Sequence, residues 1–383
     1  MRSLRLALIA AACLCFNACS TLRPEPAAEV DLVDPDATAE TRNLFANLQR
    51  LAPNYVLFGH QDDLAYGVGW RREPGRSDVH SVTGSYPAVY GWELGDLENG
   101  VAMNLDNVNF EEMKGWIREG YERGGVITIS WHMDNPVTKG SSWDTTSAVY
   151  SILPGGENHA LYRSWLDRFA DFARDLRVGD TYIPIIFRPF HEHTGGWFWW
   201  GAGHLTPEQY VQLWRFTVEY LRDEKDLHHL LYAYSTDVFR DEGHYFEHYP
   251  GDDYVDILGF DDYQTLNNEA RLPELHERLR TVVRLARERD KVAAMTETGA
   301  NGIPQSDWWT ARVLSAIEHD AQTRGIAWVL VWRNFNEGHH FAPYPGHSSA
   351  DDFVRFHESE TILFESELPD LYVHPDESGE PRQ

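Results

Sequence analysis

Two short runs of this sequence each hold a glutamate beside other residues that can do chemistry. Glu192 lies within Arg188–His193, and Glu297 lies within Thr296–Gly299. Two carboxyl groups roughly 5 to 5.5 Å apart can hydrolyse a glycosidic bond with retained configuration, one as proton donor and the other as nucleophile. The acid must stay protonated, which burial or a neighbouring carboxylate favours, and the nucleophile must stay charged. Arg188 is a candidate donor to the charged carboxylate, and this chemistry needs no metal or cofactor.

The elements that must position these glutamates alternate between strand and helix. Apolar or β-branched runs predict eight strands, at Val56–His60, Ala88–Glu93, Val126–His132, Ile183–Arg188, Leu230–Ser235, Val255–Phe260, Val292–Glu297 and Ile326–Trp332. Helical spacing predicts helices that include Phe110–Arg123, Ala160–Leu176, Pro207–Arg222, Pro273–Arg289 and Asp307–Gln322. This order favours an α/β fold of the (β/α)8 barrel type in a single catalytic domain, with a doubly wound open sheet as the alternative.

Strand after strand ends in groups that are expensive to bury. These are His60, Glu93, His132, Arg188, Ser235, Asp261 just beyond the sixth strand, Glu297 and Trp332-Arg333. The carboxyl ends of barrel strands converge on one mouth, so Glu192 after the fourth strand and Glu297 on the seventh are expected to meet there. Either glutamate alone could be a structural ion-pair partner, whereas the two together favour catalysis.

At these residues the sequence resembles glycoside hydrolase family 26, a β-mannanase family with the acid/base after strand four and the nucleophile on strand seven. The resemblance covers most of the chain, and its most specific stretch is Arg188–Gly201, with an arginine, a His-Glu pair and an aromatic run ending in glycine. It implies that Glu192 is the acid/base, that His191 orients and tunes it, and that Trp197 lines the cleft. The sequence departs from the common pattern at His193, where Met is frequent.

The same resemblance implies roles for residues on other strands. Asp261 and Tyr263 match an Asp-x-Tyr element, in which the tyrosine donates to the nucleophile and the aspartate helps to hold the site. His132 resembles the strand-three histidine that touches the sugar before the cut. Trp332 looks like the platform under that sugar, and Arg333 like the contact to the next sugar outward. An indole face suits a pyranose ring, and a guanidinium offers forked donors to hydroxyls. His60–Asp63 and Trp92-Glu93 complete the walls without assigned roles.

Composition disfavours nucleic acid and anionic membranes as partners and is compatible with a polysaccharide substrate. With 60 acidic and 33 basic residues the formal charge is −27, which repels nucleic acid and anionic membranes. The 14 Trp, 18 Tyr and 18 Phe offer faces on which sugar rings can stack. These features favour a neutral polysaccharide as substrate. The family resemblance implies mannan or manno-oligosaccharide, and we expect a monomeric enzyme.

The first residues read as an export signal. Arg2 and Arg5 precede an apolar run too short to span a bilayer, and Phe16–Cys19 resembles a bacterial lipoprotein box in which Cys19 is acylated. We expect a signal at 1–19, a linker at 20–38 and the catalytic domain at 39–375. If Cys19 is acylated, we expect the protein to be anchored to the outer membrane. If the signal is instead cleaved without acylation, we expect a periplasmic or secreted protein. All three cysteines lie within the signal, so the folded body has none to pair.

Other functions remain open alternatives. Within the family, β-1,3-1,4-glucanases and xylanases share the mechanism. A metal-dependent barrel hydrolase could use His191 and His193 as an His-x-His pair, although such enzymes place that pair on strand one. A non-catalytic sugar-binding lipoprotein would use the same aromatics. The long segments Leu64–Pro87 and Val137–His159 are expected to be loops, either of which could block the cleft and convert internal cleavage into release of mannobiose.

Overall fold

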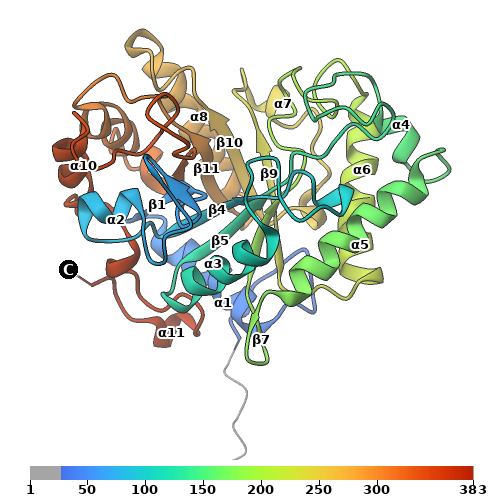
Figure 1. Cartoon of the computed structure of the whole chain (residues 1–383), viewed down its shortest axis with the longest axis horizontal. Helices are drawn as coiled ribbons and strands as arrows, with labels where there is room; N and C mark the ends of the chain where they lie inside the picture. Colours follow the sequence, from blue (N-terminus) through green and yellow to red (C-terminus); the bar gives the residue numbers. More distant parts are fainter. Residues whose placement is uncertain (1–26, 383) are drawn as a thin grey trace, which may run out of the picture.

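The computed structural model describes residues 27–382 and contains a closed barrel of eight parallel strands (Figure 1). The strands are β1 (Val56–Gln61), β4 (Val89–Glu93), β5 (Val126–Ser130), β8 (Ile185–Arg188), β9 (Leu230–Thr236), β10 (Ile257–Asp262), β11 (Val292–Thr298) and β12 (Trp328–Val331). Neighbours pair in this order, and β12 pairs with β1 from Leu57–Trp328 to His60–Val331. The barrel prediction is confirmed, and the open sheet is wrong because the first and last strands are hydrogen-bonded to each other.

Both faces of the strands are buried, as their near-continuous apolar sequences indicate. In β1, Leu57 packs with the residues inside the barrel, whereas Val56 and Phe58 pack with the surrounding shell. Phe58 stacks on Phe364 at 4.7 Å between ring centroids and meets Phe353 edge-on at 5.2 Å. Alternate side chains of a strand thus join two different cores.

Helices follow most strands and cover the outside of the barrel (Figure 1). The longer ones are α3 (Phe110–Glu122), α5 (His159–Asp175), α6 (Pro207–Glu219), α8 (Leu272–Arg287) and α10 (Ala350–His357). N-capping side chains set where two of these helices begin. The Asn109 side chain accepts from two N–H groups at the start of α3, and Thr206 and Gln209 form a capping box before α6, with Pro207 as its first residue.

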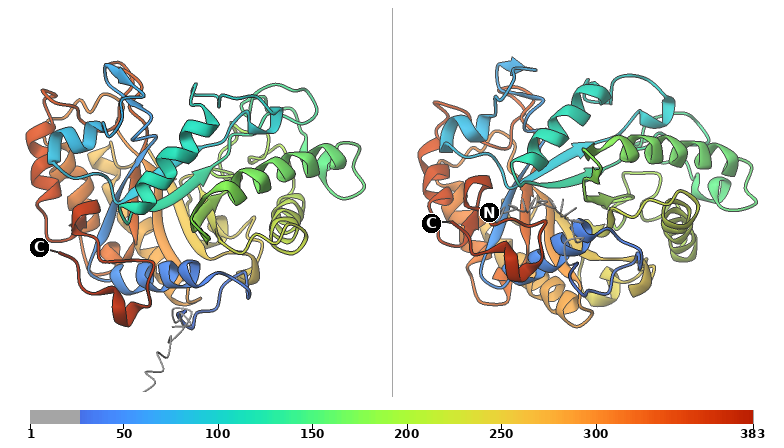
Figure 2. Two further views of the ribbon diagram at one scale, coloured as in Figure 1. Left: turned by 60° about the horizontal axis from the view of Figure 1, so that its bottom comes forward. Right: turned by 90° about the horizontal axis from the view of Figure 1, so that it is seen from below.

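The helix α1 (Ala39–Leu51) precedes the barrel and lies across the end where the strands begin (Figure 2). Leu44, Phe45 and Leu48 are buried there with the first inward-facing residues of several strands. These apolar side chains close the lower end of the barrel, where the strands begin. The upper end, where the strands finish, is the end that can hold an active site.

Two predicted helices differ from the structure. The segment Asp307–Gln322 is not one helix: it contains a π-helical stretch at Trp309–Leu314 and then the short α9 (Ser315–Ile317), and a 3₁₀ turn at Thr323–Gly325 follows it. Trp309 is fully buried against Phe353 and Phe356, so aromatic packing overrides the regular period here. The helix predicted at Pro207–Arg222 continues beyond α6 as a π-helical stretch at Tyr220–Glu224.

The predicted domain boundaries need correction where the chain is described. Residues 27–38 were expected to be linker, but Leu32 and Val33 are buried, and the Val33 N–H donates to Asp256 at 2.9 Å. At the other end α11 (Pro375–Ser378) crosses the expected limit of 375, and Arg50 donates to the Ser378 hydroxyl. The signal and Cys19 lie outside the described residues. Between 27 and 382 we find no helix with the length and hydropathy needed to cross a bilayer.

The segments expected to be loops carry short elements. Leu64–Pro87 contains the hairpin β2 (Tyr66–Gly67) and β3 (Trp70–Arg71), followed by α2 (Asp78–Thr83), and Val137–His159 contains α4 (Val149–Ile152). Asp78 accepts from the Trp70 indole and from Asn334, which ties the hairpin to the segment after β12. Other short elements are β6 (Arg177–Val178), β7 (Thr181–Tyr182), α7 (Glu242–Tyr245) and β13 (Ile362–Leu363), and β13 pairs with the start of β1.

Candidate active site

Glu297, near the end of β11, is held by two donors from other strands. Arg188 at the end of β8 donates from Nη2 to Oε2 at 2.5 Å, and the Tyr263 hydroxyl, just after β10, donates to Oε1 at 2.6 Å. Glu297 is 6% exposed. Both donors are suited to a carboxylate, and each oxygen has one, so the orientation of the group is fixed.

Arg188 is shared between Glu297 and a second buried carboxylate. Its Nη1 donates to Asp261 Oδ2 at 2.7 Å, while Asp261 Oδ1 accepts from Ser235 at 3.0 Å and from Thr296 at 2.7 Å. Burial raises the pKa of Asp261 to about 7, against the lowering effect of Arg188. Asp261 therefore fixes the guanidinium, and through it Glu297.

Glu192 lies in the turn after β8. Its Oε2 accepts from the Trp197 indole N–H at 2.7 Å. Burial and then the negative charges of Glu297 and Asp261 raise the pKa of Glu192 well above its ordinary value. Asp237, just after β9, adds a further negative charge that the sequence did not single out, and burial raises its own pKa to about 7. One site thus holds two glutamates in unlike environments, and the environment of Glu192 favours its protonated form.

His132 and His191 form a pair behind these groups. His132 Nδ1 lies 2.8 Å from Glu93 Oε2, and its Nε2 lies 3.1 Å from His191 Nε2. Burial opposes a charge on His132, but the carboxylate of Glu93 raises the pKa of His132 above its usual value. Burial and Arg188 lower the pKa of His191 well below its own. His132 is therefore the donor of the pair, and the hydrogen bond of the His191 ring is to His132 rather than to Glu192.

Glu93 is the anchor of this histidine. It is fully buried at the end of β4 and accepts from the His132 backbone at 2.7 Å and from the Ser130 hydroxyl at 2.6 Å. Burial alone would raise the pKa of Glu93, but its bonds and attraction to His132 lower it to about 2. The sequence placed Glu93 in the wall without a role. Its neighbour Trp92 instead packs into the shell, parallel to Trp116 at 6.1 Å.

Trp332 and Arg333 extend the site from the end of β12. Trp332 is partly exposed and meets His132 edge-on at 6.2 Å. Arg333 forms an ion pair with Asp106 at 2.8 Å and donates to the Tyr66 hydroxyl at 3.3 Å, and its guanidinium lies over the Phe335 ring. Nothing in the spacing of Asp106 or Tyr66 pointed to this contact.

Near Arg333, Asp62 and Asp106 each have one carboxyl oxygen without a hydrogen-bond partner within the described residues. Asp62 accepts from Tyr66 at 2.5 Å, yet its Oδ1 and Asp106 Oδ2 are buried without a partner within the described residues. Burial, followed by the charge of Asp106, raises the pKa of Asp62 to about 8. Nearby, His60 is bound to Asp63 at 2.6 Å. Neutral carboxyls can donate as well as accept, which suits sugar hydroxyls.

An exposed tryptophan that the sequence did not single out lies against His132. Trp143, in the long segment after β5, is 53% exposed, stacks on His132 at 5.3 Å and 13°, and packs against Phe198 at 5.5 Å. Trp197 lies beside Glu192, to which its indole N–H donates. Exposed indole faces held by buried rings are suited to stacking on pyranose rings.

His191 and His193 do not converge as a metal-binding pair. His191 contacts His132, while His193 lies between the hydroxyls of Tyr210 and Tyr234. Within residues 27–382 no three His, Cys, Asp or Glu side chains are arranged to hold a metal ion.

The chain is similar in sequence and structure to known glycoside hydrolases. The sequence profile of glycosyl hydrolase family 26 matches residues 33–350. The chain belongs to glycosyl hydrolase family 26. A solved β-mannanase of this family from Bacteroides ovatus is 45% identical, with 88% of this chain and 98% of that one covered and a TM-score of 0.85. A modular endo-β-1,4-mannanase from Cellulomonas fimi is 39% identical, with 90% and 79% covered and a TM-score of 0.84.

A curated relative is longer than this chain. The mannan endo-1,4-β-mannosidase of Bifidobacterium adolescentis is 35% identical over 88% of this chain but only 36% of its own length. The chain therefore spans about a third of the length of that relative.

Proposed function

We propose that this chain is a retaining glycoside hydrolase that cleaves β-1,4-mannosidic linkages in mannan or manno-oligosaccharides. The observation that carries the proposal is the pair of unlike carboxyls: Glu297, bound by Arg188 and Tyr263, and Glu192, whose pKa is raised well above its usual value. The mannanase names of the family relatives support the substrate.

The geometry fits a double displacement. Glu297 attacks the anomeric carbon to form a glycosyl ester while Glu192 gives its proton to the departing glycosidic oxygen. Glu192, now a carboxylate, takes a proton from water, which attacks the same carbon and releases Glu297. Tyr263, Arg188 and Asp261 hold the nucleophile throughout.

The position of the acid orients the substrate. The leaving sugar must lie on the side of Glu192, next to Trp197, because Glu192 protonates its oxygen. The sugar that becomes bound to Glu297 then lies toward His132 and Trp332, and the next sugar outward lies toward Arg333.

A product time course tests the proposal on unbranched mannan, galactomannan, xylan and mixed-linkage glucan. Manno-oligosaccharides from the first two alone are expected. A ladder of products with falling viscosity would mean internal cleavage, and mannobiose alone would mean release from a chain end. Activity confined to xylan or glucan would retain the mechanism and contradict the substrate.

We further propose that the protein is exported and anchored by an acylated Cys19 to the bacterial outer membrane. The support is the basic start, short apolar run and lipoprotein-like box in residues outside the described part. Expression of the full chain in a Gram-negative host should place it in the membrane fraction, and Cys19→Ser should release it. Soluble wild-type protein would contradict the anchor.

A further inference from the structure

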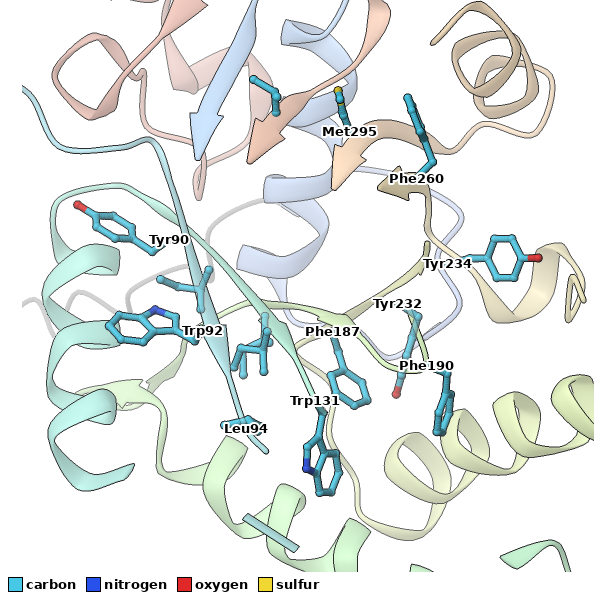
Figure 3. Packing of buried hydrophobic residues seen from close by; sticks show 14 of the residues in the cluster. Tyr90, Trp92, Leu94, Trp131, Phe187, Phe190, Tyr232, Tyr234, Phe260 and Met295 are labelled. Atoms are coloured by element: carbon cyan, nitrogen blue, oxygen red, sulfur yellow. The ribbon is translucent and has the colours of Figure 1, made fainter. Parts of the chain in front are cut away.

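His193, the residue after the proposed acid/base, is buried between two tyrosines from different elements. Its Nδ1 lies 3.0 Å from the Tyr210 hydroxyl on α6, and its Nε2 lies 2.9 Å from the Tyr234 hydroxyl on β9. The ring is 1% exposed, with centroids 4.4 and 4.7 Å from the two tyrosine rings. Figure 3 shows Tyr234 projecting outward from β9, on the side where the helices lie. The two ring nitrogens thus connect the turn after β8 to both a helix and a strand.

The turn that carries Glu192 has a strained backbone. Phe190 and Glu192 both have left-handed φ angles, of 50° and 54°. Such conformations are unfavourable for non-glycine residues and persist only where surrounding contacts enforce them. The Glu192 N–H donates to Ser235 O at 3.0 Å, and the Trp200 indole donates to His191 O at 2.9 Å. Both bonds hold the peptide group that precedes Glu192, the Gly195 N–H donates to Glu192 O at 2.8 Å after it, and His193 supplies the side-chain anchor of the turn.

Counting protons assigns a tautomer to this anchor. Tyr234 lies 2.7 Å from the Tyr245 carbonyl and Tyr210 lies 3.1 Å from the Phe190 carbonyl, and carbonyl oxygens can only accept. If both hydroxyls donated to carbonyls, both nitrogens of His193 would have to donate and the ring would be a cation. Burial, with the neighbouring His248 ring at 5.4 Å, lowers the pKa of His193 well below its usual value, so the ring is neutral. The shorter carbonyl bond belongs to Tyr234, so Nε2–H donates to Tyr234 and Tyr210 donates to Nδ1.

We propose that His193 is a positioning residue for the acid/base: its neutral imidazole, held between Tyr210 and Tyr234, keeps the left-handed turn in the conformation that aims the Glu192 carboxyl at the leaving oxygen. The inference rests on the proposed glycosidase function. Glu192 has two duties, and proton donation to a poor leaving group is the one most sensitive to where its carboxyl points.

The test compares leaving groups in His193→Leu and Tyr210→Phe. An unsubstituted manno-oligosaccharide needs the proton of Glu192, whereas a dinitrophenyl β-mannobioside has a leaving group that does not. For His193→Leu we expect kcat/KM to fall about 10- to 100-fold on the oligosaccharide and to change less than about threefold on the aryl substrate. Tyr210→Phe, which keeps the ring and removes one hydroxyl, should show the same selective loss at smaller size. His193→Gln, a neutral side chain with a donor and an acceptor, should restore most of the loss.

Tyr245→Phe is the matched control. It removes a buried hydroxyl from the same aromatic cluster, one that donates to Gly259 O at 3.0 Å, without touching His193 or its turn. It should lower the melting temperature and leave the ratio of kcat/KM between the two substrates unchanged. Equal losses on both substrates in His193→Leu and Tyr210→Phe, or no loss in either, would overturn the inference while the wild type stays active. A wild type inactive on both substrates would overturn the proposed function and this inference with it.

Discussion

Individual side chains divide the proposed reaction between two glutamates by giving them different environments. Glu297 has a guanidinium and a phenol aimed at its two oxygens, whereas Glu192 has one indole donor and several negative neighbours. A carboxylate surrounded by donors is a stable anion, and one surrounded by carboxylates keeps its proton. The same residue type therefore serves two roles.

Removing either glutamate should separate those roles. Glu297→Ala is expected to abolish turnover of every substrate, because no ester can form. Glu192→Ala should lower kcat/KM on unsubstituted manno-oligosaccharides by about 10²–10⁴-fold and spare a dinitrophenyl mannobioside. Steady-state kinetics on the two substrates checks this, and equal losses in Glu192→Ala would contradict its assignment as the acid.

The raised pKa of Glu192 predicts the alkaline side of the pH profile. The acid works while it is protonated, so kcat/KM on manno-oligosaccharides should be full below the pKa of Glu192 and fall as pH rises through it. With the dinitrophenyl substrate this fall should be absent, because its leaving group needs no proton. The measurement is kcat/KM against pH for both substrates, and parallel alkaline limbs would assign that limb to another group.

At the scale of elements, the two ends of the barrel have separate tasks. Polar groups at the upper ends of β4, β5, β8, β10, β11 and β12 make the site, while α1 fills the lower end with apolar side chains. Stability can therefore be changed at one end without altering the chemistry at the other.

Leu44→Ala tests that separation. Leu44 is fully buried on α1, so its truncation should cost about 2–5 kcal/mol of unfolding free energy, whereas Leu44→Met should cost less than about 1.5 kcal/mol. Urea unfolding measures the loss, and kcat of the folded enzyme should match the wild type in both variants. A large fall in kcat would mean that α1 acts on the site.

At the scale of the whole molecule, the large net negative charge is not expected to contribute to substrate binding. The formal charge is −27, yet the proposed substrate is neutral. Binding should therefore rest on stacking and hydrogen bonds, which salt does not screen.

Salt dependence checks this. The KM for unbranched mannan should stay constant when NaCl is raised from about 0.05 to about 0.5 M, a range over which the Debye length shrinks several-fold. Oligosaccharides of the same length that carry carboxylates provide the comparison, since the negative protein should repel them most strongly at low salt. A steep change in the KM for mannan would indicate that charge takes part in its recognition.

The sequence by itself determined the barrel and located the residues that we propose to react. Eight apolar runs can be recognised locally as buried strands. Glu192, Glu297, Arg188 and Tyr263 lie at or just after the ends of strands that must converge in a closed barrel. It failed at Asp307–Gln322, where packing of Trp309 decides the backbone, and at residues 27–38, whose contacts are with distant parts of the chain.

Only the tertiary structure decided which distant groups meet. Asp106 reaches Arg333, and His193 is held by Tyr210 on a helix and Tyr234 on a strand. Trp143 stacks on His132 because of how the segment after β5 folds. Each of these side chains alone is an ordinary residue, since no local spacing records a contact across the barrel. The protonation of Glu192 is decided in the same way, because burial and the charges of Glu297 and Asp261 act through space.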